Sequence, residues 1–450
     1  MMSEVTTATT LGWSPEEPTA RGVANAVSRA IREGTLKPGM KLPPIRSVAA
    51  ELRLSPTTIS AGWSLLARSG AIQTDGRRGT TIAEIHPGSA RYRKAMDRHS
   101  FFTQDLSTGV PDPSLLPDLS TALQTLTTAA TPGGYLDEPV VPELLALLRQ
   151  DWPYPAEQFT IVDGAMDAIE MVSRAMVRFG DRVVVEHPTF PLLLDQLEAA
   201  GADVVGVPLD DQGMLPGPLA EALSVSAAAV LVQPRAHNPT GVSLTTTRAQ
   251  KLADIIRAAG STVIEDDSAG SVAVTEAISL GSWIPQQTLH IRSFSKSHGP
   301  DLRLAAMSGP ETVIDAIVSR RQLGQGWSSR FLQRILLGLL IEEEPVAQVA
   351  HAREEYQRRR QSVITALAER GVEVGGNDGI NIWVPVADES AAIVRLASQG
   401  IGVTPGAPFT VLADSPGHIR VTVGAVAHSH TELAEMIAQA SRAGGWVGGR

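Results

Sequence analysis

Lys296 is the residue of this chain best placed to act as an amine nucleophile. The chain has five lysines among 38 basic residues, and its last three quarters contain only Lys251 and Lys296. Lys251 lies in a stretch whose polar and apolar spacing is typical of a surface helix. Lys296 instead stands in the segment Ser-Phe-Ser-Lys-Ser-His-Gly-Pro-Asp-Leu-Arg. This setting suits an aldehyde cofactor that carries a phosphate, because the amine can form a Schiff base while Ser293, Ser295 and Arg303 bind the phosphate dianion.

Further polar segments follow predicted strands, at the edge where a parallel sheet collects its ligands. Residues 163–168 open a predicted helix, whose backbone amides suit a phosphate. The Asn-Pro-Thr-Gly turn at 238–241 holds an amide side chain rigidly, and a carboxylate within 265–267 could keep a pyridine nitrogen protonated. Taken singly, each has a simpler interpretation: a plain turn, solvated acids or, for Lys296, an ordinary surface lysine. Their combination favours a cofactor site.

The composition is that of a globular protein of two or three domains. The chain has 450 residues, 43% of them hydrophobic, and its longest strongly apolar stretch, around 335–341, is too short to cross a bilayer. It has no cysteine, which excludes disulfides and thiolate metal sites, and its histidines show no ligand spacing, so we expect no metal. The first residues lack the basic start and apolar run of a signal peptide. We therefore expect a cytoplasmic protein without a membrane span.

Charge divides the chain into unlike parts. Residues 18–84 carry ten basic and four acidic side chains, a net charge of +6, whereas the chain from residue 105 onward carries −16. Residues 1–17 form an N-terminal tail, and residues 85–105 are expected to form a basic linker. A small basic unit on a large acidic one suggests a polyanion partner for the first and a small-molecule or protein role for the second.

The basic unit has the pattern of a winged helix-turn-helix. Apolar positions recur at helical spacing over 21–31, a second helix is predicted from about residue 44, and a third, capped by Ser55, over 56–68. Two short strands then flank an Asp-Gly turn within 71–82. Three helices and a basic hairpin suit duplex DNA, with the third helix entering the major groove and the hairpin lying along the backbone.

The order of these segments resembles the GntR family of bacterial regulators, over roughly residues 18–84. The resemblance rests on Leu-Pro-Pro-Ile-Arg at 42–46, the Ser-capped third helix and a Gly-rich wing at 76–80. It implies double-stranded operator DNA as a partner, with contacts from Arg46, Ser55, Thr57, Thr58, Ser60, Arg77 and Arg78. Family members often have arginine directly after the capping serine, where this chain has Pro56, so a phosphate or base contact is lost. The alternative is a small helical domain used for dimerisation.

From residue 106 to residue 450 the chain is predicted to form an α/β body. Helical stretches alternate with β-branched runs at 182–185, 203–207, 229–232 and 262–264. Alternation of this kind predicts a mostly parallel sheet covered by helices.

In order and spacing, the pieces of this body resemble fold type I pyridoxal phosphate enzymes of the aminotransferase class. The resemblance implies a smaller C-terminal α+β subdomain and pyridoxal 5'-phosphate as cofactor. In that family a lysine forms the internal aldimine, which Lys296 matches, and an aspartate pairs with the pyridine nitrogen, which Asp266 matches, or Asp267 by register. Asn238 is implied to bond the ring hydroxyl and Phe190 to stack on the ring.

The same resemblance implies the remaining contacts of the cofactor and of a substrate or effector. Phosphate contacts are implied for Ala165, Ser293, Ser295, Arg303 and for Tyr135 of the partner subunit. An arginine near the carboxyl end clamps the carboxylate of the amino compound, and Arg420 matches it, since its planar fork suits bidentate binding.

Both halves together resemble the MocR-type regulators, in which a GntR-like domain is fused to an aminotransferase-like body. The segment 109–117 is also similar to the opening of the body in that subfamily. The resemblance implies a homodimeric transcriptional regulator that binds DNA and senses pyridoxal phosphate, or an amino compound, at Lys296. Ligand binding would shift the body between two arrangements and so change how the DNA-binding units sit on DNA.

Two departures from the family affect the expected chemistry. Ser268 stands where the family usually has a tyrosine whose phenol donates to the ring oxygen, and the shorter hydroxyl should slow proton transfer. The segment 135–141 lacks the usual glycines. We expect cofactor binding with weak or no turnover. Two alternatives stay open: an aminotransferase acting on an amino acid with an accessory N-terminal domain, and a regulator whose body is purely structural. His298 is interpreted as solvent-facing or as a local hydrogen-bond partner.

Overall fold

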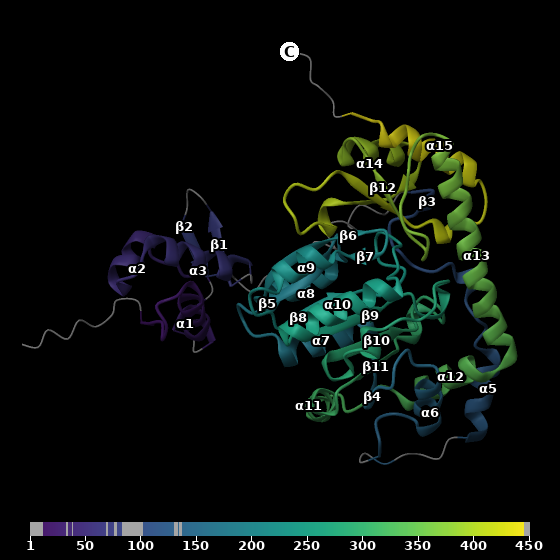
Figure 1. The fold of residues 1–450 in the computed structure, drawn as a ribbon, viewed down its shortest axis with the longest axis horizontal. Helices are drawn as coiled ribbons and strands as arrows, with labels where there is room; N and C mark the ends of the chain where they lie inside the picture. Colours follow the sequence, from purple (N-terminus) through teal and green to yellow (C-terminus); the bar gives the residue numbers. More distant parts are fainter. Residues whose placement is uncertain are drawn as a thin grey trace, which may run out of the picture.

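The structure is a computed structural model that shows a small helical unit beside a large body with a central sheet (Figure 1). It describes residues 12–32, 35–37, 39–68, 71–75, 79–82, 102–129, 134 and 137–444. The expected wing tip with Arg77 and Arg78, most of the expected linker, and Tyr135 lie outside these residues.

The N-terminal unit has the predicted three helices and hairpin. These elements are α1 (Ala20–Arg32), α2 (Ile45–Leu52), α3 (Pro56–Arg68), β1 (Ile72–Asp75) and β2 (Gly79–Ile82). The N-cap predicted for α3 is present, because Ser55 Oγ accepts the backbone N–H of Thr58 at 3.0 Å. Apolar side chains from all three helices and both strands, such as Val27, Ile59 and Leu66, pack into one core.

The body is built on an eight-stranded, mostly parallel sheet, as the alternation predicted. Its strands are β4 (Gln158–Val162), β5 (Arg182–His187), β6 (Asp203–Asp210), β7 (Gly213–Met214), β8 (Ala229–Val232), β9 (Thr262–Asp267), β10 (Thr288–Ser293) and β11 (Ala305–Gly309). Their order is β4-β11-β10-β9-β8-β5-β6-β7, with the pairs from β10 to β6 parallel and the remaining pairs antiparallel. The carboxyl ends of β5, β8, β9 and β10 therefore meet at one edge.

Helices cover both faces of this sheet, because alternate residues of its central strands point to opposite sides. Val183 and Val185 pack with α7, α8 and α11, whereas Val184 packs with α9 and α10. The helices of the body are α5 (Ser120–Ala129), α6 (Pro142–Gln150), α7 (Ala165–Met176), α8 (Pro191–Ala199), α9 (Pro216–Ala222), α10 (Thr246–Ala259), α11 (Glu311–Gln322), α12 (Arg330–Ile341), α13 (Glu343–Ala368), α14 (Glu389–Ser398) and α15 (His430–Ser441). None of the helices in the described part of the chain has the length and apolar character that a membrane span requires.

Short 3-10 helices occur in several connections of the body. They are η1 (Pro113–Leu115), η2 (Gly270–Val272), η3 (Leu280–Ser282), η4 (Pro285–Gln287), η5 (Pro300–Leu302), η6 (Ala407–Phe409) and η7 (Val423–Ala425).

The smaller C-terminal subdomain has its own sheet and core. The sheet has the order β12-β15-β14, formed by β12 (Ile382–Pro385), β14 (Thr404–Pro405) and β15 (His418–Val421). Figure 1 shows α14 and α15 over this sheet, and the 26-residue helix α13 running along the body from α12 to the subdomain.

The start of the body differs from the prediction. Gln104–Asp105, expected to end the linker, form β3, which pairs in parallel with β13 (Ile401–Gly402). The pairing partner lies far later in the chain, so no local pattern indicates this strand. The subdomain thus holds the chain on the C-terminal side of the linker.

We expect Leu66→Ala to unfold the N-terminal unit at a lower temperature while the unfolding transition of the body stays unchanged. Leu66 is fully buried in the core of this small unit, and such a truncation costs about 2–5 kcal/mol. Scanning calorimetry of the whole chain measures both transitions. Ser64→Ala, on the exposed face of the same helix, is the matched control; a single transition displaced as a whole would contradict the expectation.

Candidate functional site

Lys296 lies after the carboxyl end of β10, a strand that the sequence analysis did not predict. It lines a pocket together with residues that include Asn238, Ser268 and the segment 378–381. The pKa of Lys296 is lowered to about 8 by burial and by the positive charge of Arg420, while the negative charge of Asp266 acts to raise it. A larger fraction of the amine is therefore uncharged near neutral pH than for an exposed lysine, as a nucleophile requires.

The two candidate aspartates at the end of β9 point to opposite faces of the sheet. Asp266 alternates with Ile264, which packs in the core on the α7 side, and it is paired in register with Ile291. Asp267 faces the other way, where Arg235 donates to both its oxygens at 3.0 and 2.7 Å. Burial acts to raise the pKa of Asp267, but Arg235 holds it below its ordinary value. Asp267 is thus paired within the protein.

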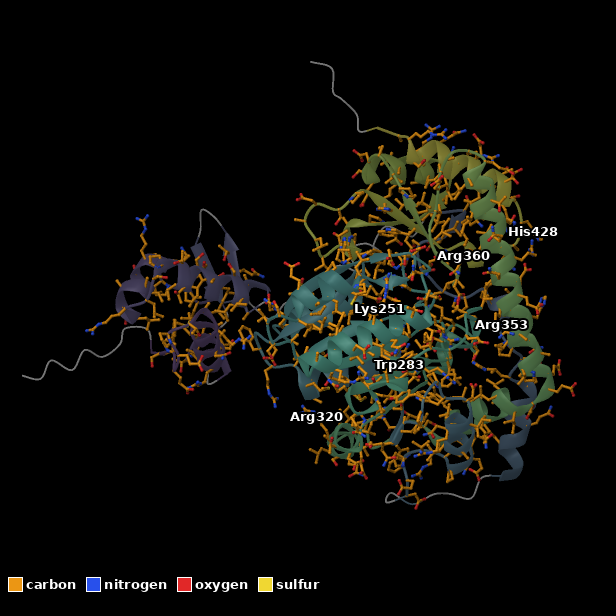
Figure 2. The ribbon with its side chains drawn as sticks, in the orientation of Figure 1. Lys251, Trp283, Arg320, Arg353, Arg360 and His428 are labelled. Carbon is orange, nitrogen blue, oxygen red and sulfur yellow. The ribbon has the colours of Figure 1, made fainter. Side chains whose placement is uncertain are left out.

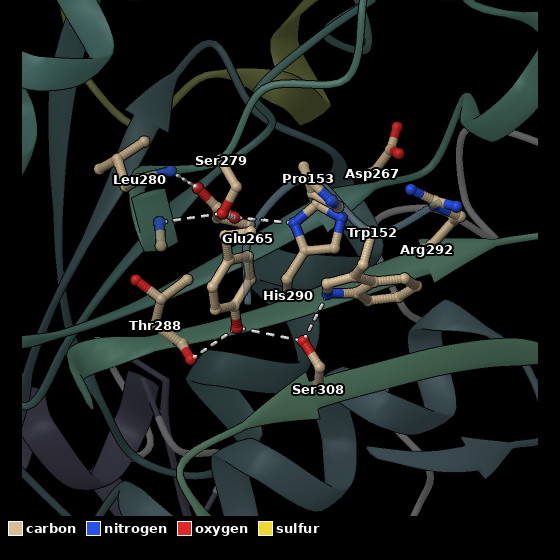
Figure 3. A network of polar contacts seen from close by, with 12 residues as sticks. Trp152, Pro153, Glu265, Asp267, Ser279, Leu280, Thr288, His290, Arg292 and Ser308 are labelled. Carbon is tan, nitrogen blue, oxygen red and sulfur yellow. Dashed lines mark hydrogen bonds and ion pairs between the residues drawn. The ribbon is translucent and has the colours of Figure 1, made fainter. Parts of the chain in front are cut away.

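The face behind Asp266 is held by a buried polar network (Figure 3). Glu265 accepts the N–H of Leu280 and the hydroxyl of Ser279, both at 2.6 Å, and its Oε2 lies 2.7 Å from His290 Nδ1. Nearby, Arg292 lies over the ring of Trp152 at 4.6 Å. These contacts join β9 and β10 to the connection that follows β9, and so fix the strand that carries Asp266.

Asp266 itself keeps one oxygen without a partner. Its Oδ2 accepts from Gln233 Nε2 at 2.7 Å, whereas its buried Oδ1 has no hydrogen-bond partner among the described residues. Burial raises the pKa of Asp266 to about 6, with the Gln233 hydrogen bond lowering it, Asp267 raising it and Lys296 lowering it. Near neutral pH the group is mainly a carboxylate, able to accept a hydrogen bond from a cationic ligand.

The start of α7 forms a cradle at the same edge. Gly164 has φ +107°, and a Cβ built there would lie 2.9 Å from an Arg303 guanidinium nitrogen. Arg303 donates to the carbonyl of Asp163 at 2.9 Å, which holds its side chain across the first turn. Ala165 opens α7, whose first N–H groups have no partner within the helix, so the cradle suits an anion.

Ser293 and Ser295 lie on the chain that leads from β10 to Lys296. The hydroxyl of Ser293 accepts the N–H of Ser295 at 3.3 Å. Ser293 is buried and Ser295 is half-buried. Their place next to Lys296 agrees with the predicted phosphate side of the site, and their contact with a phosphate stays a prediction.

Arg420 lies buried on β15, with its guanidinium close to Asn238. It donates to Asn238 Oδ1 at 3.3 Å, to Thr404 Oγ1 at 3.2 Å and to the carbonyl of Ser107. Its guanidinium carbon also lies 5.1 Å from the ring centroid of Phe409. Arg420 and Lys296, predicted from segments more than a hundred residues apart, thus lie near enough for one to shift the pKa of the other.

Other predicted residues are placed less tightly. Phe190 is half-buried at the start of α8, directly after the cis-proline turn that ends β5, and its stacking role stays a prediction. His298 is buried, so the solvent-facing alternative is wrong; the local one is confirmed, since its Nδ1 lies 2.8 Å from Ser297 Oγ.

The predicted DNA contacts that the structure describes lie on or near the surface. Arg46, Ser55, Thr57 and Ser60 are exposed, and Thr58 is half-buried. Ser55 Oγ lies 2.7 Å from Thr57 Oγ1 and 2.8 Å from Thr58 Oγ1, so these hydroxyls form one cluster at the start of α3.

The site includes residues that the sequence analysis missed. Gln233 binds Asp266, Arg235 neutralises Asp267, and Thr404 holds Arg420. The only signal available for Gln233 and Arg235 was their position directly after a predicted strand. Thr404 had none, because it meets Arg420 only through the pairing of β14 with β15.

The residues present fit pyridoxal phosphate. A pyridinium N–H suits Asp266 Oδ1, which has no partner among the described residues, and a phosphate suits the start of α7, where the guanidinium of Arg303 lies directly against Gly164. When bound, this cofactor supplies an aldehyde that condenses with an amine and a ring that withdraws electrons. Lys296 would offer the amine; Asn238 lines the same pocket and accepts from Arg420, and its bond to the ring hydroxyl stays a prediction.

A second buried acid lies beneath the site. Glu186, on β5, accepts the backbone N–H of Gln233 at 2.7 Å, and its Oε2 lies 3.5 Å from His237 Nε2. Burial raises the pKa of Glu186 to about 8, although this hydrogen bond acts to lower it. The folded protein therefore keeps a proton on Glu186 near neutral pH, whereas the unfolded chain releases it.

Glu186→Gln should flatten the decline of stability with rising pH. In the wild type, Glu186 stabilises the fold fully below its ordinary pKa of 4.5, and this contribution is lost as pH rises toward about 8, by up to about 4 kcal/mol. Glutamine mimics the protonated form at every pH. Urea unfolding at several pH values between 5 and 8.5 measures the difference. Glu221→Gln, at an exposed position, is the control, and parallel pH profiles of the wild type and Glu186→Gln would refute the expectation.

Comparison with known proteins assigns both parts of the chain. A model of the bacterial regulatory proteins of the gntR family matches residues 19–82, and a model of aminotransferase class I and II matches residues 104–439. The vitamin B6 salvage pathway transcriptional repressor PtsJ of Salmonella typhimurium is 36% identical over 416 residues, which cover 90% of this chain and 94% of that protein.

Other matches agree with this assignment. The HTH-type pyridoxine biosynthesis transcriptional regulator PdxR of Corynebacterium glutamicum is 25% identical over 87% of this chain and 89% of that protein. The crystal structure of Pyrococcus horikoshii kynurenine aminotransferase with PMP superimposes with a TM-score of 0.68 at 22% identity, over 80% of this chain and 96% of that one, which shows a shared fold. The aminotransferase class I and II model covers most of the chain, the gntR model covers the part before it, and PtsJ is similar over nearly the whole length. This chain therefore belongs to the MocR-type transcriptional regulators, whose aminotransferase-like part is of a pyridoxal phosphate-dependent family.

Proposed function

We propose that this regulator binds operator DNA through residues 18–84 and holds pyridoxal phosphate covalently on Lys296 in a homodimeric body of residues 106–450. Residues 85–105 would connect the two. The cofactor, or an amino compound that reacts with it, is the proposed signal. The names of PtsJ and PdxR, which concern vitamin B6 salvage and pyridoxine biosynthesis, favour the cofactor itself. Since its target is DNA, we expect it to act in the cytoplasm.

One observation carries this proposal. Asp266, whose buried Oδ1 has no partner in the part of the chain that the structure describes, and Lys296, with a lowered pKa, lie in one site that also contains Asn238 and Arg420. Burial of the charges of Asp266 and Lys296 costs stability unless a ligand compensates it. A solvated or purely structural lysine would not explain why both groups are buried in one site.

The contact between the N-terminal unit and the body supports a route from ligand to DNA. Arg21 of α1 donates to the carbonyl of Gly180 and lies 3.9 Å from Asp181, and Phe179 packs against the core of the unit. These three residues of the body follow α7 closely, and α7 begins at the cradle beside Arg303. A shift of α7 on binding a phosphate would therefore reach α1 directly.

The rival function is that of a working aminotransferase. The buried Arg420, close to Lys296, favours it, because a guanidinium there could bind the carboxylate of an amino acid. Ser268 counts against it: its hydroxyl lies 3.4 Å from Gln233 Nε2, and it is shorter than the tyrosine usual in the family. Steady turnover of an amino acid with a keto acid would favour the rival, and single-turnover behaviour would favour the regulator.

Lys296→Ala should abolish the absorbance band near about 420 nm that pyridoxal phosphate develops on binding to a lysine amine. It should also abolish any change of DNA affinity on adding the cofactor, while DNA binding without cofactor persists. Spectra from 300 to 500 nm and fluorescence anisotropy of labelled operator DNA measure both. Lys251→Ala is the control, because Lys251 lies exposed on α10 (Figure 2). An unchanged band in Lys296→Ala would remove Lys296 from the site.

Arg46→Ala should weaken binding to operator and unrelated DNA alike. An exposed arginine near the start of α2 is expected to neutralise one phosphate, so the slope of log affinity against log salt should fall by about 0.9. Titrations at several salt concentrations measure the slope. Arg29→Ala is the control, because it removes the same charge from an arginine that is paired with Glu16 at 2.8 Å. An equal fall of the salt slope in both variants would contradict a phosphate contact made by Arg46 itself.

A further inference from the structure

Gln233 has more contacts with the proposed cofactor residues than any role in packing explains. It follows β8 directly and is buried. Its Nε2 donates to Asp266 Oδ2 at 2.7 Å, and its Oε1 accepts the backbone N–H of Asn238 at 2.7 Å. One amide side chain thus joins the residue expected at the pyridine nitrogen to the residue expected at the ring hydroxyl.

These two contacts determine which way the amide points. An N–H of Asn238 requires an oxygen opposite it, so the oxygen of Gln233 must face Asn238 and its NH2 group must face Asp266. A reversed amide would place two donors together at Asn238 and two acceptors together at Asp266. The donor to Asp266 is therefore fixed by the backbone of the Asn-Pro-Thr-Gly turn.

The backbone of Gln233 is anchored as well. Its N–H donates to Glu186 Oε2, which lies near His237 Nε2, and His237 Nδ1 lies 2.8 Å from Thr240 Oγ1 of the same turn. Burial lowers the pKa of His237 to about 3, so this ring is neutral and brings no charge near Asp266. The anchor holds Gln233 in place by hydrogen bonds alone.

The neighbouring pair shows what a charged partner would do. Asp267 meets the guanidinium of Arg235, and this ion pair is buried on both sides. Asp266 instead meets a neutral amide, which orients the carboxylate and leaves its negative charge for a ligand. A lysine or arginine at position 233 would neutralise Asp266 and weaken its attraction for a protonated ring nitrogen.

We propose that Gln233 is a positioning residue for the cofactor: it orients Asp266 so that Oδ1 meets the ring nitrogen, and it holds Asn238 in register with it. The inference rests on the proposed binding of pyridoxal phosphate at Lys296. Gln233 acts through Asp266, and no contact between Gln233 and the cofactor is needed.

The test compares two cofactors in the variant Gln233→Met, which keeps the length of the side chain and removes both its donor to Asp266 and its acceptor for Asn238. Pyridoxal phosphate has a ring nitrogen, and its 1-deaza analogue has a C–H group in that position. Loss of a hydrogen bond to a charged group should weaken the binding of pyridoxal phosphate by about 10- to 100-fold. Binding of the deaza analogue should weaken by a smaller factor, since it makes no use of Asp266 and depends on Gln233 only through Asn238. Fluorescence titration of the apoprotein gives all four dissociation constants.

Gln333→Met is the matched control. Gln333 is equally buried and makes three hydrogen bonds of 2.9 Å, to Val141, Pro139 and Ser328, away from the site. It should not alter the ratio of the two dissociation constants. If Gln233→Met does not fold, Gln233→Leu, which also lacks both the donor and the acceptor, takes its place.

Each outcome decides a different question. An equal loss for both cofactors, or no loss for either, would overturn the role of Gln233 while leaving cofactor binding intact. Failure of the wild type to bind pyridoxal phosphate would overturn the proposed function itself. A larger loss for the cofactor with a ring nitrogen than for its deaza analogue supports the inference.

Discussion

A carboxylate that must stay charged away from water is the constraint on which this site depends. Burial raises the pKa of Asp266 to about 6 and lowers that of Lys296 to about 8, so both groups are shifted toward their neutral forms. Neither shift is removed by a contact within the protein, since Asp266 Oδ1 has no partner among the described residues. A ligand that offers a cationic N–H to the acid and takes up the amine in a bond relieves both costs at once. The site therefore suits a ligand that carries a cationic N–H and an amine-reactive group at a fixed separation.

The end of β9 shows how the chain prevents this charge from being neutralised internally. Three acids follow one another, and each has a different partner: Glu265 receives three hydrogen-bond contacts, Asp267 receives Arg235, and Asp266 receives only the neutral amide of Gln233. Strand alternation places Asp266 on the opposite face of the sheet from the other two, and the parallel pairing with β10 fixes its position along the strand, opposite Ile291. A shift of one residue in the register would place an acid already paired with arginine or histidine at the site, and the charge available to a ligand would be lost.

The parts of this site that the sequence predicts are those with local signatures. Lys296 and Asn238 belong to short segments whose residue types are unusual together, so both residues could be identified. The β-branched run at 229–232 also predicted the edge of the sheet for Asn238, whereas the strand before Lys296 was not predicted. The resemblance assigned Asp266 but left Asp267 open by register, because the sequence could not show that Arg235, 32 residues away, pairs with Asp267 once β8 and β9 lie side by side. Gln233, Thr404 and β3 were missed for the same reason: their partners are set by strand pairing, which no local pattern specifies.

Arg420 connects the site to the first residues of the body, which follow the linker from the DNA-binding unit in the sequence. It donates to the carbonyl of Ser107, and Ser107 follows β3 by two residues, at the point where the body continues from the linker. A carboxylate that binds Arg420 would compete with that carbonyl for the guanidinium, because Thr404 and Asn238 already accept from the same group. Under the proposed function, an amino compound bound at Arg420 would remove one of the two side-chain donors to the carbonyl of Ser107, the other being Thr404 Oγ1 at 2.7 Å, and would so act on the segment that leads to the linker. The phosphate of the cofactor would instead act at α7, on the side that contacts α1. The two signals would reach the DNA-binding unit by separate routes, so the cofactor alone and its adduct with an amino compound need not have the same effect on DNA binding.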